Sequence, residues 1–509
     1  MSSKINTFGK VFTFLNKNDK IIIESITKRG NEMLQTIKGV KNERPFYYFE
    51  EISKIPHGSR NEKEIAKYIV DFATKHNIEC SIDEANNVFI VKKATQGREN
   101  EPTVMLQAHT DMVCEKNIST KHNFETDSIK LIQEGNILRA DGTTLGADDG
   151  FGVAIMLAIL ENEELSHPKI ECLFTSSEEI GLVGASKFDY SRVTATQMIN
   201  LDSAEENTVI IGCCGGLRSD MTLPCEIEEN KKPAYKITIG GLIGGHSGED
   251  IDRKRLNSHI LMGKILKSIK EVTDFKIAYI SGGDKDNAIP RECETVISVD
   301  NSNALDARLE KIIETAHACV QAREDEGLFV KFEKTDTSST FSALDTDKIL
   351  KILSLPNAVL KYREVAPILP SMSRNLARIR TIGNKVEIGF SSRAYNEAGL
   401  NESAFELENV ANEIGAEIYH HEGYPAWQDE TDSPLVLKYQ KAYNEATGRK
   451  TEPTLIHAGL ECGVITSKVK GLLAISVGAN VHDLHTPKEI MEIDSMDRIY
   501  DTVCTFLGK

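Results

Sequence analysis

Five short segments of the chain carry a carboxylate or an imidazole immediately after a hydrophobic run. They are residues 107–111, 146–150, 177–179, 200–202 and 484–487. Together they supply two histidines and several Asp and Glu residues, which is the set of ligands that a pair of zinc ions prefers. Two adjacent cations can activate water and polarise a carbonyl group at the same time. Hydrolysis is therefore the first hypothesis for the chemistry of this chain.

The elements that must position these residues alternate along the first part of the chain. Between residues 46 and 211, hydrophobic spacing predicts helices over 61–75, 151–160 and 182–188 and strands over 88–91, 103–108, 170–174 and 197–201. Such alternation is typical of an α/β layer with a mostly parallel sheet. In proteins with such sheets, ligands bind beyond the carboxyl ends of the strands. The residues that follow the expected strands here are His109, Glu178, Glu179 and Asp202. The sequence therefore predicts that these segments form one site.

A second domain interrupts this pattern after the glycine-rich segment 212–216. It has its own expected strands and helices, over 235–239, 295–299, 386–390, 256–272 and 305–322. The first pattern then resumes with a helix over 434–446, a strand over 472–477 and a closing helix over 494–507, capped by Asp494 or Ser495. We expect an N-terminal extension over 1–42, a catalytic domain over 43–214 and 425–509, and an inserted α+β lid domain over 215–424.

Composition excludes several classes of function. Of the 509 residues, 40% are hydrophobic and 27% are charged, as in an ordinary soluble protein of two or more domains. The 77 acidic and 60 basic residues give a net charge of −17, so there is no basic surplus for nucleic acid. No apolar run is long enough to span a membrane, and residues 1–42 fit a docked or mobile extension better than a signal peptide. The ten scattered cysteines favour a reducing, cytoplasmic location.

His109 and Asp111 lie two residues apart at the end of an expected strand. Side chains at that spacing point to the same face, so Asp111 can hold the ring nitrogen of His109 that a metal leaves free. A polar pair with a purely structural role is the alternative, because so short a motif is common.

Asp148 and Asp149 precede an expected buried helix. A helix N-cap explains one aspartate but not two in succession, whereas a carboxylate shared between two cations explains the crowding of like charges. Glu178 and Glu179 allow two interpretations as well. They belong either to a solvated loop or to a metal site in which one binds metal and the other takes a proton from water.

Two segments of the expected lid carry further candidates. His246 lies in the glycine-rich stretch 244–248 and can face a ligand, although most such stretches are only turns. Arg393 ends an expected strand and can hold a substrate carboxylate through two hydrogen bonds. A surface arginine is the alternative.

In combination and in order, these segments resemble the di-zinc aminoacylase and glutamate-carboxypeptidase superfamily. Within it they are most similar to the peptidase D type, the aminoacyl-histidine dipeptidases. The similarity extends from about residue 47 to the C-terminus. Its motifs are LQAHTDMVCEKN from Leu106, DGTTLGADDGFGVA from Asp141, TSSEEIGLVGA from Thr175, NLDSAEE from Asn200, GGHSGEDI from Gly244, IHAGLECG from Ile456 and LHTPKE from Leu484.

The resemblance implies a zinc-peptidase fold, in which helices sandwich a mixed sheet and a lid closes over a dipeptide. It implies two zinc ions bridged by Asp148, with manganese or cobalt as alternative metals. One ion would also bind His109 and Asp202, and the other would bind Glu179 and His485.

The resemblance also implies the roles of the remaining candidates. Glu178 would be the general base, and Asp111 would orient His109. In the expected lid, His246 would help to stabilise the oxyanion, and Asn287 and Arg393 would bind the substrate ends. Gly459, in the second part of the expected catalytic domain, would contribute its backbone to substrate binding.

One residue departs from the family pattern. Peptidase D often has asparagine after the bridging aspartate, whereas this chain has Asp149, which leaves the metal preference open. A cis peptide after Asp148 is implied as well.

The leading hypothesis is a metallo-dipeptidase that hydrolyses the amide bond of a small peptide, either Xaa-His or dipeptides more broadly. The alternatives are an N-acyl-amino-acid amidohydrolase or a tripeptidase of the same superfamily, and a non-catalytic scaffold. The complete set of metal ligands argues against the scaffold. A homodimer is left open, because in smaller-lid relatives a partner subunit donates the equivalent of His246, which a long lid can supply in cis.

Overall fold

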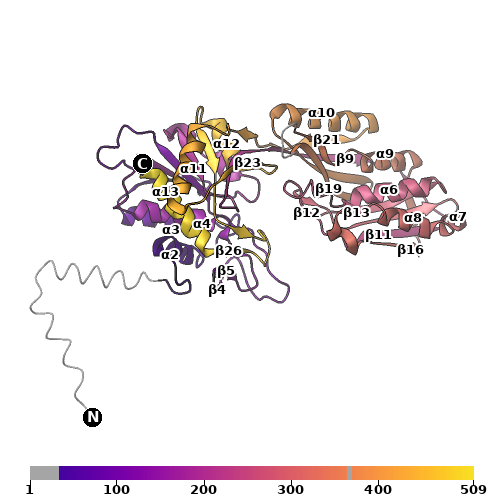
Figure 1. Cartoon of the computed structure of the whole chain (residues 1–509). Helices are drawn as coiled ribbons and strands as arrows, with labels where there is room; N and C mark the ends of the chain where they lie inside the picture. The colour runs from indigo at the N-terminus through magenta and orange to yellow at the C-terminus, as the bar shows by residue number, and fades with distance from the viewer. Residues whose placement is uncertain (1–33, 364–368, 509) are drawn as a thin grey trace, which may run out of the picture. The chain divides into compact units, whose positions relative to one another are not determined.

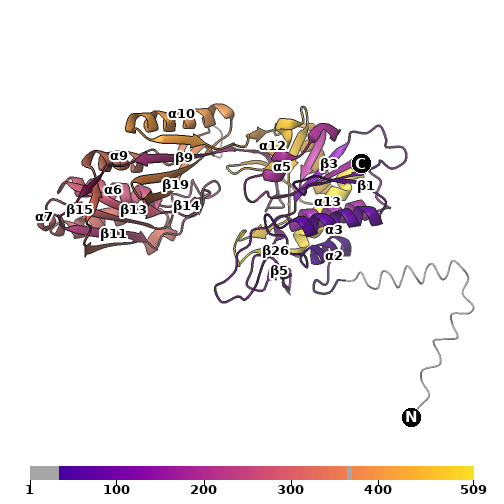
Figure 2. The same cartoon turned by 180° about the vertical axis from the view of Figure 1, so that it is seen from behind.

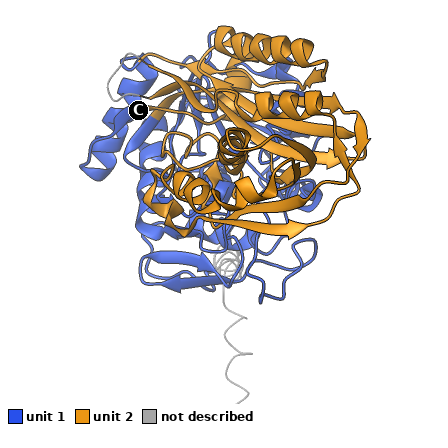
Figure 3. Cartoon of the chain, turned by 90° about the vertical axis from the view of Figure 1, so that its right-hand side faces the viewer, with its two compact units in different colours: residues 1–209, 431–453, 471–509 blue, residues 210–430, 454–470 orange. Residues whose placement is uncertain are grey.

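The structure is a computed structural model that describes residues 34–363 and 369–508. The chain forms two compact units (Figure 3). Unit 1 comprises the chain up to Val209, Thr431–Pro453 and the chain from Gly471 onward, and unit 2 comprises Ile210–Glu430 and Thr454–Lys470. The domain boundaries expected from the sequence stay a prediction. In this division residues 454–470, which the sequence analysis assigned to the catalytic domain, group with unit 2.

Unit 1 is built on a mixed sheet with the strand order β1-β2-β6-β3-β7-β24. The central pairs β6-β3, β3-β7 and β7-β24 are parallel, whereas β1-β2 and β2-β6 are antiparallel. Strands β3 and β6 are buried along their whole length, which explains their nearly continuous apolar sequences. The strands are β1 (Glu79–Ile82), β2 (Val88–Lys92), β3 (Val104–His109), β6 (Ile170–Thr175), β7 (Gln197–Asn200) and β24 (Leu473–Ser476).

Helices flank this sheet (Figures 1 and 2). Helix α4 is apolar on nearly every side because it packs against β3 and contacts both α2 and α13. The α/β layer expected from the sequence is confirmed, with a sheet that is mixed. The helices are α2 (Glu43–Ile52), α3 (Lys63–Lys75), α4 (Ala147–Glu161), α5 (Val183–Lys187), η1 (Tyr190–Arg192), α11 (Pro434–Thr447) and α13 (Ile493–Leu507).

A smaller antiparallel sheet of unit 1 has the order β25-β26-β5-β4. Its strands are β4 (Leu131–Glu134), β5 (Ile137–Ala140), β25 (Val481–His482) and β26 (Ile490–Glu492). Helix α13 follows β26 directly, so the predicted cap by Asp494 or Ser495 is wrong. The N-cap is Glu492, while the N–H of Asp494 donates to the Asn136 side chain at 3.0 Å and the Ser495 hydroxyl donates to the Glu492 carbonyl at 2.6 Å.

Part of the expected N-terminal extension is docked on unit 1. The Glu50 carboxylate accepts the backbone N–H groups of Gln35, Thr36 and Ile37 at 2.7–2.8 Å. The Asp497 carboxylate accepts those of Lys41 and Asn42, both at 2.9 Å. Residues 1–33 of the extension lie outside the described residues.

Unit 2 contains an antiparallel sheet with the order β16-β11-β15-β13-β19-β20-β9-β21, and β18 pairs with β19. Alternate residues such as Tyr235, Ile237 and Ile239 of β11 are buried in one core with apolar residues of helices α6, α8, α9 and α10. The strands are β9 (Gly215–Pro224), β11 (Ala234–Gly240), β13 (Phe275–Gly282), β15 (Cys293–Val299), β16 (Phe329–Thr335), β18 (Ala358–Tyr362), β19 (Pro370–Ile382), β20 (Lys385–Ala394) and β21 (Glu417–His420).

One predicted helix of unit 2 is wrong in its extent. The stretch 305–322 contains only the end of α7 and the whole of α8, which ends at His317. The chain turns between these helices at Arg308, whose N–H donates to the Leu305 carbonyl at 2.8 Å. The helices of unit 2 are α6 (Ser258–Lys270), α7 (Ser302–Asp306), α8 (Leu309–His317), η2 (Arg323–Gly327), α9 (Ala343–Leu353), α10 (Glu397–Ile414) and α12 (Glu461–Lys468).

Short strands complete the chain. They are β8 (Thr208–Cys213), which pairs with β22 (Trp427–Gln428) and β23 (Glu452–Ile456), and the pairs β10 (Ile227–Glu229) with β17 (Ser339–Phe341) and β12 (Gly245–His246) with β14 (Ala288–Ile289). Over the described ranges, no helix combines the length and the apolar character that a membrane crossing requires.

Candidate active site

The predicted metal ligands of unit 1 come together in space. His109 is the last residue of β3, Glu179 and Asp202 follow β6 and β7, Asp148 lies at the start of α4, and His485 lies between β25 and β26. Their ligand atoms form groups within 4.8 Å of one another, namely His109 with Asp148 and Asp202, Asp148 with Glu179 and His485, and His109 with Glu178 and Glu179. The structure therefore brings side chains from five separate segments together, and their role as metal ligands stays a prediction.

Asp148 lies at the centre of this cluster. Its Oδ1 is 3.1 Å from His109 Nε2, and its Oδ2 is 3.0 Å from His485 Nε2. On the first side Asp202 Oδ1 lies 3.7 Å from His109 Nε2, and on the second side Glu179 Oε1 lies 3.0 Å from His485 Nε2. The cluster thus divides into two sets of ligands that share one carboxylate.

The two consecutive aspartates have different partners. The peptide bond between Asp148 and Asp149 is cis, as the resemblance implied. The buried Asp149 carboxylate accepts the backbone N–H of His109 at 3.1 Å, and burial raises its pKa well above the usual value. Neither aspartate is the N-cap of α4, because that position is Gly146. Asp149 therefore tethers the end of β3, which accounts for a second aspartate.

Asp111 connects the end of β3 to the turn that carries both glutamates. Its carboxylate accepts the backbone N–H groups of Glu178 at 2.9 Å and Glu179 at 3.3 Å, as well as the Ser59 hydroxyl at 2.7 Å. Its Oδ1 lies 3.5 Å from His109 Nδ1, while its backbone carbonyl oxygen lies 2.9 Å from the same nitrogen. Sequence reasoning missed Ser59, because the segment before it contains no strand or metal motif.

The ionisation of the cluster shows what it is suited to bind. Burial disfavours the charged form of both imidazoles, but the hydrogen bonds that His109 donates to the Asp111 and Asp148 carboxylates raise its pKa well above the usual value. Asp148 and Glu179 likewise raise the pKa of His485 to about 12. Burial and the charge of Asp148 raise the pKa of Glu179. The carboxylates thus hold protons on imidazoles that divalent cations would displace, so the donor set fits two such ions.

The predicted lid residues gather within unit 2. His246 Nε2 lies 3.3 Å from Arg393 Nη2, and Arg393 Nη1 donates to the Tyr424 hydroxyl at 2.7 Å. Arg393 is 6% exposed, so its interpretation as a surface arginine is wrong. Asn287 adjoins the pair of strands that includes His246, and its carbonyl accepts the Ser247 N–H at 2.8 Å.

Tyr424 is a residue that sequence reasoning missed. A Cβ added to Gly459 would lie 2.4 Å from its ring, and one added to Gly216 would lie 2.3 Å from it. Glycine at both positions leaves space for the ring of Tyr424, whose hydroxyl accepts from Arg393. Gly459 therefore has a steric role in addition to the predicted contact of its backbone with substrate. The signal available in the sequence was only a tyrosine between Gly423 and Pro425.

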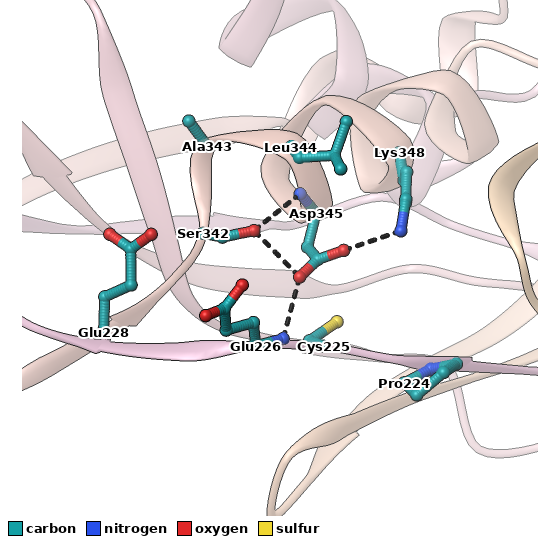
Figure 4. Close-up of a pocket in the computed structure, with 9 residues that line it drawn as sticks. All are labelled: Pro224, Cys225, Glu226, Glu228, Ser342, Ala343, Leu344, Asp345 and Lys348. Atoms are coloured by element: carbon teal, nitrogen blue, oxygen red, sulfur yellow. Dashed lines mark hydrogen bonds and ion pairs between the residues drawn. The ribbon is translucent and has the colours of Figure 1, made fainter.

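A separate pocket of unit 2 contains none of these residues (Figure 4). Asp345 dominates its polar contacts, accepting from the Glu226 N–H at 2.8 Å, the Ser342 hydroxyl at 2.9 Å and Lys348 Nζ at 2.9 Å. Because these groups satisfy one another, the pocket offers no cluster comparable with the one around Asp148.

Comparisons with known proteins identify the family of the chain. The sequence profile of peptidase family M20/M25/M40 matches residues 105–509. The cytosol non-specific dipeptidase of Escherichia coli (strain K12) is 32% identical over 470 residues, covering 91% of this chain and 96% of that protein.

Solved structures show the same similarity. The crystal structure of aminoacylhistidine dipeptidase from Vibrio alginolyticus has a TM-score of 0.78 and 32% identity, covering 93% of this chain and 98% of that one. A tripeptidase from Staphylococcus aureus subsp. aureus Mu50 has a TM-score of 0.54 and 16% identity, covering 92% and 98%, and is similar in fold. On the extent of the profile match and of the 32% identity, the chain belongs to peptidase family M20/M25/M40.

Proposed function

We propose that this protein is a metal-dependent dipeptidase that hydrolyses the amide bond of Xaa-His and other dipeptides. The observation that supports this most is the division of ligands around Asp148, whose two carboxylate oxygens each face a different imidazole. The names of the two relatives at 32% identity, both dipeptidases, support the substrate class.

Two zinc ions are the proposed cofactors, with manganese or cobalt as alternatives. One would be held by His109, Asp148 and Asp202, and the other by Asp148, Glu179 and His485. When bound, such ions lower the pKa of water and polarise a carbonyl oxygen.

Glu178 is proposed as the general base. Its backbone is anchored by the Asp111 carboxylate at 2.9 Å, and its side chain belongs to a group with His109 and Glu179. It would take a proton from the attacking water and later give it to the leaving amine. Asp111 would keep His109 oriented through the contacts at Nδ1.

The residues of unit 2 are proposed to recognise the substrate. The guanidinium of Arg393, held by Tyr424, would bind the C-terminal carboxylate of a dipeptide, with Asn287 and the backbone of Gly459 as further contacts. His246 would stabilise the oxyanion. Whether His246 acts in cis or within a homodimer is a question for the oligomeric state in solution.

Location and partners follow from the same proposal. A cytoplasmic location is proposed because the described cysteines are free thiols and the Escherichia coli relative is named as a cytosol protein. A small peptide is the proposed partner, with neither nucleic acid nor membrane.

A substrate panel tests this proposal against its alternatives. The zinc-loaded protein is assayed with dipeptides, tripeptides and N-acetyl amino acids, each with and without EDTA. We expect EDTA-sensitive cleavage with the highest kcat/KM on dipeptides. A higher kcat/KM on N-acetyl amino acids or on tripeptides would replace this proposal with the amidohydrolase or the tripeptidase, and no cleavage of any dipeptide would refute it.

A further inference from the structure

Four consecutive backbone N–H groups of unit 1 converge on the carboxylate of Glu489. Its Oε2 accepts from Leu145 at 2.8 Å and Gly146 at 3.2 Å. Its Oε1 accepts from Ala147 at 2.8 Å and Asp148 at 3.4 Å. The Glu489 side chain is 2% exposed. A buried carboxylate with this many donors replaces the hydration that it loses on burial.

The turn that Glu489 contacts needs an external partner. It forms the start of α4, and the first N–H groups of a helix have no acceptor within the helix. The N-cap, Gly146, has a left-handed φ of 70° and supplies no side-chain cap. The two aspartates that follow are engaged elsewhere, Asp148 with the imidazoles and Asp149 with the backbone of His109. Glu489 therefore takes the place of a local cap.

Glu489 also terminates the loop that carries His485. Its own N–H donates to the Thr486 carbonyl at 3.1 Å, and the Thr486 hydroxyl donates to the Asp483 carbonyl at 2.8 Å. His485 and Asp483 both have left-handed backbones, with φ of 60° and 52°. A residue other than glycine pays a cost in free energy to adopt this conformation, which persists only when surrounding contacts hold it.

These contacts close a ring between two ligand segments. On one side His485 Nε2 lies 3.0 Å from Asp148 Oδ2, and on the other side, four residues further along, Glu489 accepts the N–H groups of the Asp148 turn. A change in Glu489 would therefore move the two segments relative to each other.

We propose that Glu489 is a positioning residue, which fixes the shared carboxylate of Asp148 against His485 so that both metal ions can bind. This inference rests on the proposed function. Glu489 lies in the LHTPKE segment, but the sequence pattern assigns no role to it. A cap that only stabilises the fold is the competing explanation.

Glu489→Gln separates these explanations because it keeps size and shape. The amide has one acceptor oxygen, and its NH2 group must face one of the two pairs of N–H groups. Glu489→Asp serves as a second variant, since it keeps the charge but shortens the side chain. Glu99→Gln is the matched control, because Glu99 is an exposed glutamate of the same unit.

The measurements are zinc bound per chain at buffered free zinc, turnover of an Xaa-His dipeptide, and the melting temperature with zinc and with EDTA. We expect Glu489→Gln to need about 10- to 100-fold more free zinc than Glu99→Gln and to lose turnover by a similar factor, as for other groups that orient metal ligands. The rise in melting temperature caused by zinc should shrink. A pure cap would lower both melting temperatures equally.

Three outcomes decide the matter. Zinc affinity and turnover of Glu489→Gln equal to those of Glu99→Gln would overturn the positioning role while leaving the proposed function intact. If Glu489→Gln does not fold, the same comparison is made with Glu489→Asp, and wild-type zinc affinity in that variant overturns the role. A wild-type protein that binds no zinc and cleaves no dipeptide would refute the proposed function itself.

Discussion

At the scale of single residues, neighbouring carboxylates acquire different tasks from the atoms that they face. Both glutamates of the turn, Glu178 and Glu179, are half-buried and donate their backbone N–H groups to the Asp111 carboxylate, and Glu179 Oε1 also lies 3.0 Å from His485 Nε2. The turn begins at Ser177, whose φ of 52° is left-handed. On the contact between Glu179 and His485 rests the proposal that Glu179 is the metal ligand and Glu178 the residue that transfers the proton.

Replacing Glu178 by Gln should therefore separate chemistry from metal binding. We expect kcat to fall by about 10²- to 10⁴-fold, the usual contribution of a general base, with zinc content near that of the wild type. Glu179→Gln is the matched control and should lose zinc. Steady-state kinetics and elemental analysis check this, and lost zinc with unchanged turnover in Glu178→Gln would contradict the assignment.

Tyr424 offers a second prediction at this scale. Tyr424→Phe removes the oxygen that accepts from Arg393 Nη1 at 2.7 Å and leaves the packed ring in place. Because hydrogen bonds to charged groups contribute about 1.5–3 kcal/mol, we expect kcat/KM for dipeptides to fall about tenfold or more. Tyr419→Phe, at a tyrosine that is 64% exposed, is the control. Identical kinetics of the two variants would exclude a role for Tyr424 in holding Arg393.

At the scale of elements, the sequence predicted β2, β3, β6, β7 and β24 of the main sheet of unit 1, because each contains a short apolar run. It did not predict β1 or the four strands of the small sheet, which are short and only partly apolar. The placement of His109 at the end of β3 and of Asp202 beyond β7 followed directly from that pattern. Caps and breaks were less predictable. The break at Arg308 and the start of α13 at Ile493 depend on hydrogen bonds to the Leu305 carbonyl and to Asn136.

Contacts between distant segments explain most of what the sequence could not predict. Glu489 meets the Asp148 turn across more than 340 residues of chain, and Tyr424 reaches Arg393 across 31. Hydrophobic periodicity describes only which face of an element is buried, so it carries no information about such partners.

Helix α6 of unit 2 provides a prediction about pH. His259 is fully buried, its Nδ1 donates to the Leu376 carbonyl at 3.0 Å, and burial lowers its pKa to about 4. Between the unfolded pKa of about 6.5 and pH 4, the unfolded chain binds a proton that the folded chain does not. His259 should therefore lower the free energy of unfolding by about 1.4 kcal/mol for each unit by which the pH falls over this range.

Denaturant unfolding from pH 7 to pH 4 measures this dependence. We expect His259→Gln to reduce the slope of unfolding free energy against pH, since it removes the titrating group. His317→Gln, at an exposed histidine of α8, should keep the wild-type slope. Equal slopes for the two variants would show that His259 does not carry the effect.

At the scale of the whole molecule, the chain passes between two units, and the proposed metal ligands all belong to unit 1. A ligand that binds only the folded state stabilises it by about 2.7 kcal/mol at a hundred times its dissociation constant. Zinc should therefore slow amide hydrogen exchange around residues 145–150 and leave β11 and β15 of unit 2 unchanged. Hydrogen-exchange mass spectrometry checks this, and protection confined to unit 2 would contradict the site.

The most direct test of the account is a zinc titration of the metal-free protein, with hydrolysis of an Xaa-His dipeptide followed at each ratio of zinc to chain. The account predicts that turnover is absent without metal, rises with added zinc, saturates at two ions per chain and disappears again with EDTA. Full turnover in metal-free protein, or no turnover at two bound zinc ions, would contradict it.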